Sequence, residues 1–448
     1  MWLDKDDNSA AVKESSNPIP AYLTLGVLLL AYILSFVDRN VMAVLIGPIR
    51  EDFAISDFQY SLLHGFAFSM FYIVLGLPIA RLADNRSRTA IITLGVLFWS
   101  LMTCLCGLAR GFTSLFVMRA GVGIGEAALS PPAYSLLSDY FSADALPRAM
   151  AVYTLGITIG GGLAYLIGGS AYEYFAGLGA VELPGFGVLR PWQLTFFAVG
   201  LPGFLVVALL ILLVKEPPRI GKPAAVQAHS LADAKAWFQG RWQAYTGLIL
   251  GVSLLSILGY GTMAWYVEFL VRSHGLGRAD AGSQFGLIFI VAGSLGTLAG
   301  GWSAQPLARR GYVDANMRVV LIVALLWMLP AIAGPLMPSR QLALLAVIPT
   351  VFLLNSYFGV SIAALQLITP NRLRAQFSAM LLFMTNLLGL ALGPSVVAAL
   401  TDFVFADDLS LRYSLALLPA IVCPLAAILV AWGLPYYRRT LIEMECTK

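Results

Sequence analysis

Long apolar stretches alternate with short polar segments along the whole chain. Each apolar stretch has about 20 residues or more, the length of helix that a bilayer core of about 30 Å requires. The first six lie at 21–46, 57–82, 88–108, 112–138, 148–173 and 192–214, and six more lie at 243–271, 280–306, 316–337, 341–369, 374–401 and 411–436. We therefore predict an all-α membrane protein with twelve transmembrane helices in two six-helix bundles.

The polar segments divide the chain into five parts. We expect a cytoplasmic tail without a signal-peptide core, an N-terminal bundle, a cytoplasmic linker, a C-terminal bundle and a second cytoplasmic tail. Their predicted ranges are 1–20, 21–214, 215–241, 242–437 and 438–448. In the linker, Ser230 and Asp233 could cap a short helix that rests Trp237 in the membrane interface. A solvated linker is the alternative.

Composition supports a membrane protein. Of 448 residues, 59% are hydrophobic and 12% are charged, whereas an average soluble domain carries about 25% charged residues. The net charge of +4 comes without runs of like charge, so no nucleic acid is expected as a partner. The four cysteines lack metal-ligand spacing, and we predict no metal site.

The distribution of Lys and Arg predicts the orientation. Cytoplasmic loops of a membrane protein carry an excess of these residues. If the N-terminus is inside, most of them fall inside, and the outer loops keep Arg50, Arg110, Arg190, Arg272, Arg278, Arg340 and Arg412. Both termini are therefore predicted to be cytoplasmic.

Four charged residues fall within predicted spans: Asp38 and Arg39 in the first, Arg119 and Glu126 in the fourth. A charge at this depth costs at least about 2.5 kcal/mol on insertion scales, so it is normally paired and functional. Arg119 and Glu126 are seven residues apart and share one helix face, and the glutamate side chain leans toward Arg119. Asp38 and Arg39 are adjacent, about 100° apart, so both cannot point directly at one partner.

The depths of these residues also match. Asp38 is about 26 Å along an outward-running helix and Arg119 about 10 Å along an inward-running one, so both reach a similar level in the outer half. Glu126 lies about 10 Å deeper, near the midplane. We predict proton coupling by Asp38, Glu126 and Arg119, and substrate binding by Arg39 and Arg119. A salt-bridge cluster that only pins the two helices is the alternative.

Other polar residues are further candidates. Glu268, near the outer end of the seventh span, is either a substrate contact or an interfacial acid. Asn355 and Tyr357 are predicted to line the substrate site from the tenth span. His64, in the second span, is a packed neutral histidine or a proton carrier.

The loop after the second span reads Ala80-Arg-Leu-Ala-Asp84-Asn-Arg-Ser-Arg88. It resembles the signature between helices two and three of the major facilitator superfamily. That resemblance implies a gate on the inner side, formed by Asp84 and Arg88. Simple anchoring of the arginines at lipid headgroups is the alternative, and it leaves Asp84 unexplained. The equivalent place in the second half has Gln305 instead of an acid.

Three short segments narrow the resemblance. Ser-Phe-Val-Asp-Arg at 35–39, Gly-Ile-Gly-Glu-Ala at 123–127 and Phe-Leu-Val-Arg-Ser-His-Gly-Leu at 269–276 are together similar to the Spinster family. This resemblance implies proton-coupled transport of lysolipids or sphingolipids, with helices one, four, seven and ten around a central cavity. The short loops suit a bacterial member in the inner membrane.

We therefore expect a proton-coupled secondary transporter of an amphipathic, lysolipid-like or sphingolipid-like substrate, working by rocker-switch alternating access. A symporter of a sugar acid or another small organic anion is the alternative, with Arg39 and Arg119 as carboxylate binders. The chain has no P-loop, H-E-x-x-H or G-x-S-x-G motif, so we predict no enzyme activity, no ATP and no cofactor besides a proton gradient. We expect a monomer whose partners are the bilayer, protons and the substrate.

Overall fold

The computed structural model describes residues 19–142, 144–185, 187–218 and 231–446. Within these ranges, twelve helical spans are long and apolar enough to cross a membrane. The predicted number of spans and the all-α fold are therefore confirmed. The first tail up to residue 18, and Ser230 with the proposed cap in the linker, lie outside the described residues.

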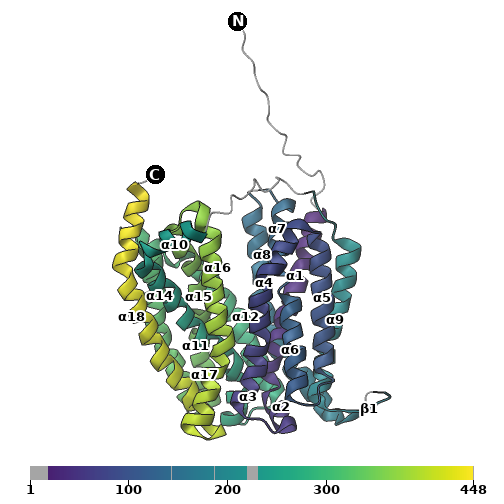
Figure 1. The fold of residues 1–448 in the computed structure, drawn as a ribbon. Helices are drawn as coiled ribbons and strands as arrows, with labels where there is room; N and C mark the ends of the chain where they lie inside the picture. Colours follow the sequence, from purple (N-terminus) through teal and green to yellow (C-terminus); the bar gives the residue numbers. More distant parts are fainter. Residues whose placement is uncertain (1–18, 143, 186, 219–230, 447–448) are drawn as a thin grey trace.

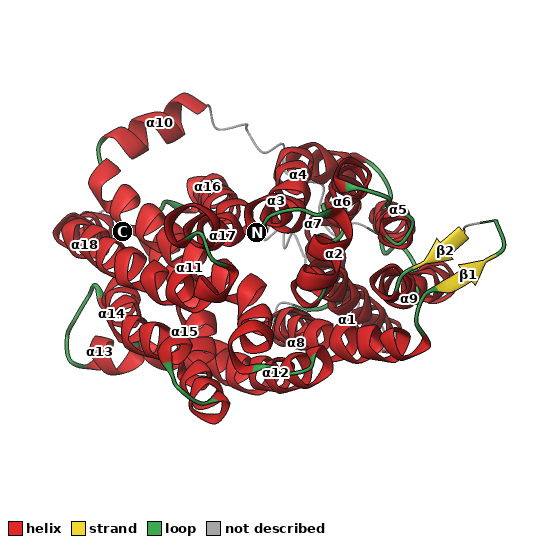
Figure 2. Ribbon diagram, turned by 90° about the horizontal axis from the view of Figure 1, so that it is seen from below, coloured by secondary structure: helices red, strands yellow, loops and turns green. Residues whose placement is uncertain are grey.

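The first six spans form one half of the molecule, drawn in purple to teal in Figure 1. Its elements are α1 (Ile19–Asn40), the 3₁₀ turn η1 (Val41–Val44), α2 (Ile46–Phe53), α3 (Asp57–Ser61), the π-helical segment η2 (Leu62–Phe66), α4 (Ala67–Asn85), α5 (Arg88–Cys106), α6 (Phe112–Glu126), α7 (Ser130–Tyr140), α8 (Leu146–Leu178) and α9 (Pro191–Leu213). A short antiparallel hairpin, β1 (Val181–Leu183) and β2 (Gly187–Leu189), joins α8 to α9 and projects from the bundle (Figure 2).

The last six spans form the other half. Its elements are α10 (Leu231–Gln239) in the linker, α11 (Trp242–His274), α12 (Arg278–Ser303), α13 (Gln305–Arg309), α14 (Ala315–Leu336), α15 (Arg340–Leu367), the 3₁₀ turn η3 (Asn371–Leu373), α16 (Arg374–Thr385), the π-helical segments η4 (Asn386–Leu392) and η5 (Leu400–Phe405) on either side of α17 (Gly393–Ala399), the 3₁₀ turn η6 (Asp408–Ser410) and α18 (Leu411–Cys446). In the linker, the Trp237 indole donates a hydrogen bond to the Tyr245 hydroxyl at 2.9 Å, which holds α10 against α11.

The two ends of the bundle differ. We call the end where α1 begins and α18 ends the termini side, and the end that carries α2, α3 and η6 the loop side (Figure 1). The halves meet along α8 and α12. These helices approach closely because Gly162 and Gly286 face each other's main chain without side chains between them, the packing typical of small residues in membranes.

A second contact between the halves is made by two π-helical segments. Segment η2 of the second span touches η4 of the eleventh. Gly65 permits this contact, since a side chain there would strike the main-chain oxygens of Leu390 and Ala391. Single-turn π segments inside α-helices are frequently found at functional sites, so the seam between the halves is a candidate functional region.

The fourth span is not continuous, contrary to the predicted helix at 112–138. Helix α6 ends at Glu126, a short turn follows, and α7 begins at Ser130 with Pro131 and Pro132 in its first turn. Proline suits that position because the first helical N–H groups have no intrahelical partner. Glu126 therefore stands at a helix end inside the span.

Candidate functional site

Arg39 and Glu126 form a buried ion pair between α1 and α6. The Nη2 atom of Arg39 lies 2.7 Å from Oε2 of Glu126, and the Ser35 hydroxyl donates to the same oxygen at 2.9 Å. Arg39 and Glu126 are 7% and 2% exposed. The predicted lean of Glu126 toward Arg119 stays a prediction, and the bond from Arg39 on the neighbouring helix was not foreseen.

Aromatic rings surround the Arg39 guanidinium. Its central carbon lies 4.7 Å from the ring centre of Phe36, 4.6 Å from Phe68 and 5.1 Å from Tyr72, within the range of cation–π attraction. We call these three rings the aromatic collar. Helix α4, which carries Phe68 and Tyr72, packs against η4 of the second half, and Tyr260 on α11 lies against Gly389 of η4. The ion pair thus lies at the seam between the two halves.

Asp38 and Arg119 meet at the same level, as the helix geometry predicts. Arg119 donates from Nη1 to the main-chain oxygen of Asp38 at 3.2 Å. Both side chains are buried, and Phe68 of the collar lies 5.5 Å from the Arg119 guanidinium. The structure therefore brings all four predicted charges into one cluster.

This central cluster is incompletely paired. Within the described residues, Asp38 Oδ1, Arg39 Nε, Glu126 Oε1 and the Nε and Nη2 atoms of Arg119 are buried without a hydrogen-bond partner. Native proteins leave few buried polar atoms in this condition, and each one calls for an explanation. A site that gains a proton or a ligand during its cycle provides one.

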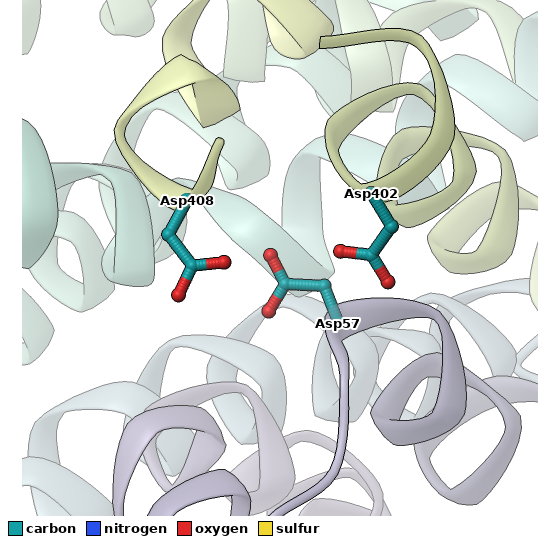
Figure 3. Close-up of side chains that lie close together, drawn as sticks. All are labelled: Asp57, Asp402 and Asp408. Carbon is teal, nitrogen blue, oxygen red and sulfur yellow. The ribbon is translucent and has the colours of Figure 1, made fainter. Parts of the chain in front are cut away.

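Three aspartates gather on the loop side, from both halves. Asp57 at the start of α3, Asp402 in η5 and Asp408 in η6 bring carboxylate oxygens within 4.8 Å of one another (Figure 3). The main-chain N–H of Phe58 donates to Asp402 at 2.7 Å, which ties α3 to η5. Such a group could hold a cation, but two arginines already supply the positive charge.

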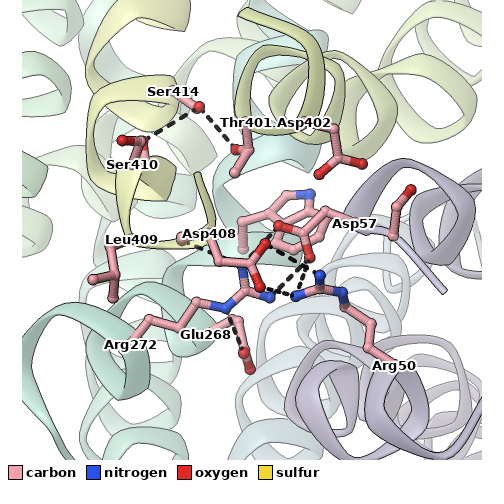
Figure 4. Close-up of polar contacts among 12 residues, drawn as sticks. Arg50, Asp57, Glu268, Arg272, Thr401, Asp402, Asp408, Leu409, Ser410 and Ser414 are labelled. Atoms are coloured by element: carbon pink, nitrogen blue, oxygen red, sulfur yellow. Dashed lines mark hydrogen bonds and ion pairs between the residues drawn. The ribbon is translucent and has the colours of Figure 1, made fainter. Parts of the chain in front are cut away.

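Arg272 at the end of α11 binds Asp57 with both terminal nitrogens, at 2.7 and 2.8 Å (Figure 4). Arg50 on α2 lies 3.0 Å from Asp57 and also binds both oxygens of Asp408, at 3.0 and 3.1 Å. Paired bonds of this kind between guanidinium and carboxylate are the stronger and more specific ones. These bonds connect the halves across the loop side.

Glu268 belongs to this network. Its two oxygens accept from Arg272 at 2.8 Å and from Arg278 at 2.7 Å, and Arg278 also donates to the main-chain oxygen of Val44 at 3.1 Å. We call the group of Arg50, Asp57, Glu268, Arg272, Arg278 and Asp408 the seam network. Glu268 is 2% exposed. In this conformation the Glu268 carboxylate pairs with Arg272 and Arg278. It does not pair with Arg39.

Asn355 and Tyr357 lie on α15 within the second half. The Asn355 amide donates to the main-chain oxygen of Val351 at 2.9 Å, one turn back on its own helix. The Tyr357 hydroxyl lies 3.1 Å from the Ser256 hydroxyl. The Tyr357 ring lies 5.8 Å from that of Trp327 and 6.3 Å from that of Phe358, both in the second half.

Arg88 joins elements of the first half on the termini side. It forms an ion pair with Asp139 on α7, binds Glu216 at 2.8 Å and donates to the main-chain oxygen of Ser135 at 3.1 Å. Burial raises the pKa of Glu216, but hydrogen bonds from the Thr89 main chain and from Arg88 outweigh burial and hold that pKa below its usual range. Asp84 is a residue of α4, and its side chain lies outside the described part of the structure.

His64 sits in η2, close to the seam. It is 7% exposed, and its Nδ1 atom has no hydrogen-bond partner within the described residues. Its ring lies 6.5 Å from that of Tyr60. No proton donor or acceptor of the central cluster bonds to it in the described structure, so it is a packed histidine in this conformation.

The seam network was missed by reasoning from sequence. Arg50, Arg272 and Arg278 were noted only as outer-loop charges, and Asp57 and Asp408 were not considered. A signal was nevertheless present, because acids and arginines alternate at the ends of spans two, seven and twelve that are predicted to be outside. Opposite charges at helix ends that share one side of a membrane are candidates for pairing across the halves.

Comparison with known proteins agrees with this geometry. The model of the Major Facilitator Superfamily matches residues 28–394. An MFS-type efflux pump of Mycolicibacterium smegmatis is 31% identical, over 95% of each chain. The protein spinster of Drosophila melanogaster is 26% identical over 86% of this chain and 62% of its own, and a probable L-galactonate transporter of Escherichia coli is 25% identical over 69% and 68%.

Solved structures agree as well. A bacterial homologue of the human lysosomal transporter Spinster, in an inward-facing and unoccupied conformation, superimposes with a TM-score of 0.78. It is 28% identical, over 96% of this chain and 98% of its own. A D-xylose–proton symporter shares the fold at 16% identity, with a TM-score of 0.67 over 90% and 97%. This chain therefore belongs to the major facilitator superfamily, as a Spinster-like transporter and not an enzyme.

Proposed function

We propose that this transporter couples protons to the movement of an amphipathic substrate, lysolipid-like or sphingolipid-like. One observation carries the proposal: a buried Arg39–Glu126 ion pair stands at the seam, inside a collar of aromatic rings. The guanidinium suits the phosphate or carboxylate of a headgroup. The collar offers apolar surface to the attached tail.

Protonation of Glu126 is the step that couples proton binding to substrate binding. The carboxylate and an anionic substrate compete for the same guanidinium of Arg39. A proton added at Oε1, the oxygen without a partner, neutralises Glu126 and frees Arg39 for the headgroup. By linkage, each ligand then changes the affinity for the other. Asp38 belongs to the same cluster because Arg119 donates to its main-chain oxygen. It is the second proposed proton site.

Alternating access follows from the same geometry. The seam network joins the halves on the loop side, so this conformation is closed there. With cytoplasmic termini, in a bacterial inner membrane, it is the inward-facing state of a rocker switch. The similarity to an inward-facing structure supports this assignment. Asp84 and Arg88 are proposed to close the termini side in the opposite state, and the monomer is the proposed transporting unit.

A sugar-acid symporter is the second candidate. Two relatives favour it: the probable L-galactonate transporter, and a D-galactonate transporter of Escherichia coli that is 24% identical over 89% of this chain and 94% of its own. A carboxylate would take the place of the headgroup at Arg39 and Arg119. The hydroxyl of Tyr72, whose ring lies beside Arg39, could then hydrogen-bond the sugar.

Counterflow in liposomes tests the proposal and separates the candidates. Purified protein is assayed with labelled lysophospholipids, sphingosine phosphate and D-galactonate, with and without a pH gradient. We expect lysolipid flux that the gradient drives, and galactonate flux in its place supports the second candidate. Glu126→Gln should abolish gradient-driven flux while it spares exchange, and Glu182→Gln in the exposed hairpin is the matched control. An unchanged pH profile in Glu126→Gln rules out Glu126 as the proton site.

A further inference from the structure

The helix that carries Asp38 and Arg39 ends in the 3₁₀ turn η1. Helix α1 stops at Asn40, whose side chain donates to the main-chain oxygen of Phe36 at 2.8 Å, and η1 follows at once. Every residue of η1 is buried, and the turn packs against α8 of the first half and α11 of the second. A stretch of 3₁₀ helix within a span often marks a functional hinge.

Pro48 explains why the α-helix does not continue from α1 through η1 into α2. In an α-helix, the main-chain oxygen of Val44 would accept from the N–H of the residue four positions further on. That residue is Pro48, which has no N–H to donate. Because Val44 is fully buried, its oxygen needs a donor from elsewhere in the protein.

The second half supplies this donor. Arg278, at the start of α12, donates from Nη1 to the Val44 oxygen at 3.1 Å, and the same nitrogen lies 2.7 Å from Oε2 of Glu268. Gly47 on α2 makes room for the arginine, because a side chain there would collide with the Arg278 guanidinium. One carbonyl of η1 is therefore bonded across the seam by a member of the seam network.

Another carbonyl of η1 is bonded within the first half. The Tyr60 hydroxyl on α3 donates to the main-chain oxygen of Met42 at 2.5 Å. The main-chain N–H of Leu45 donates to the same oxygen at 2.9 Å. If the halves separate on the loop side, these two bonds can stay, whereas the bond from Arg278 is lost. Of these three bonds, the one from Arg278 depends on closure of the loop side.

We propose that Arg278 is a positioning residue for the transport cycle, which donates to the Val44 oxygen in place of Pro48 and holds η1 in its present form only while the loop side is closed. When the loop side opens, water replaces Arg278 at that oxygen and η1 loosens. Four residues of 3₁₀ helix wind about 80° further than four α-helical residues, so unwinding of η1 turns Asp38 and Arg39 relative to α2. The inference rests on the proposed alternating access and not on the identity of the substrate.

Hydrogen exchange of the full chain in lipid nanodiscs, without substrate, tests this proposal. Gly47→Ala displaces the Arg278 guanidinium without changing any charge. We expect the main-chain N–H groups of residues 41–45 to exchange about tenfold faster in this variant, because a bond from a charged donor is lost. Pro48→Ala gives Val44 a donor four residues further on, so Gly47→Ala combined with Pro48→Ala should exchange at the parental rate.

The matched controls are Gly26→Ala and Pro202→Ala. Gly26 lies on α1 with open space around it, so its substitution should leave exchange at 41–45 unchanged. Pro202 is an exposed proline inside α9, and Pro202→Ala should not restore the rate in Gly47→Ala. Parental exchange in Gly47→Ala overturns the proposal, and so does restoration by Pro202→Ala.

A crosslink separates the bond to Val44 from opening of the loop side. Ser61 on α3 donates to Ser395 on α17 at 3.0 Å, across the seam. In a chain without native cysteines, Ser61→Cys and Ser395→Cys can therefore be joined by a short bifunctional thiol reagent, which keeps the loop side closed. Exchange at 41–45 should become slower than in the parent, but it should stay fast when Gly47→Ala is added.

Equal slowing with and without Gly47→Ala would show that Arg278 only ties the halves together, and would overturn the proposal. Transport by the crosslinked chain in liposomes reports separately on the proposed function. Flux that continues after crosslinking would refute the proposed alternating access, whereas fast exchange in Gly47→Ala would still assign Arg278 to holding η1.

Discussion

Two charged clusters of this transporter differ in how completely they are paired. In the seam network, both oxygens of Asp57 and of Glu268 accept bonds from arginines. In the central cluster, by contrast, the Arg39–Glu126 pair leaves one glutamate oxygen and one arginine nitrogen without partners among the residues that the structure describes. The seam network joins the two halves, whereas the Arg39–Glu126 pair of the central cluster joins two helices of the first half beside the seam.

This difference indicates different roles. A buried network with its members satisfied stabilises the one arrangement in which it forms. An incompletely satisfied cluster costs stability, and ionisable residues inside a membrane are by default candidates for a functional site. The comparison predicts that changes in the seam network alter the balance of conformations, while changes in the central cluster alter transport with little loss of stability.

The largest effect is expected from Arg272→Ala. It removes the arginine that links Asp57 to Glu268 and leaves two buried carboxylates underpaired, at a cost of about 3–5 kcal/mol. The loop side should open more often. In a chain without native cysteines, labelling of Ser395→Cys from the outside should accelerate roughly 100-fold.

The matched control for this test is Arg190→Ala. Arg190 lies on the same side, but its ion pair is with Asp52 in the same half, so labelling should stay at the parental rate. Equal acceleration in both variants would show that the seam network does not hold the halves together.

Arg119→Lys tests the central cluster. Lysine keeps the charge but cannot present the planar fork of donors, so the apparent affinity for an anionic substrate should fall about tenfold. The melting temperature should stay within about 2 °C of the parent, because two arginine nitrogens have no partner to lose. Full flux of every anionic candidate in Arg119→Ala would contradict a role of this residue in anion recognition.

Asp84→Asn tests the gate expected on the termini side. If Asp84 pairs with a facing helix end when that side is closed, the variant should populate the outward-open state less. Labelling of Ser395→Cys from the outside should then fall several-fold, the opposite of the Arg272→Ala result. Labelling that stays the same from both sides would leave headgroup anchoring as the function of this loop.

The smallest effect concerns Glu216, whose pKa lies below its usual range. The stabilisation from its bonds to Arg88 and Thr89 is fully present above the ordinary glutamate value of about pH 4.3. It is lost as the pH falls through the lower pKa of the folded protein. Over that interval the melting temperature should drop by less than about 2 °C. The melting temperature of Glu216→Gln should not show this drop at low pH. A drop as large as that of the parent would show that the bonds of Glu216 add no stability.

The fold was predictable because hydropathy over about 20 residues reports directly on the bilayer. The eighth and ninth predicted spans, at 280–306 and 316–337, correspond closely to the observed Arg278–Arg309 and Ala315–Leu336. The turn after Glu126 and the π segments were not predicted, because they depend on how neighbouring helices pack and not on hydropathy.

The central site was predictable in part. Charge at membrane depth identified Asp38, Arg39, Arg119 and Glu126, and counting residues along each helix placed Asp38 level with Arg119. The ion pair of Glu126 with Arg39 was not predicted, since a helical repeat shows which residues share a face but not which helix lies opposite. Glu268 shows the same limit. Its position near the end of the seventh span was predicted, but its two partners were not. Arg272 lies at the end of the same helix and Arg278 at the start of the next.

The π-helical segment η2 has a consequence for the direction in which the rest of its span faces. A π turn bonds each residue to the fifth along and so contains one residue more than an α turn. Deleting one residue between Leu62 and Phe66 would turn the rest of that span by about 100° relative to α3. Phe68 and Tyr72 would then rotate away from Arg39. The extra residue of the π turn is thus what lets one span meet the opposite half at the loop side and complete the aromatic collar further along.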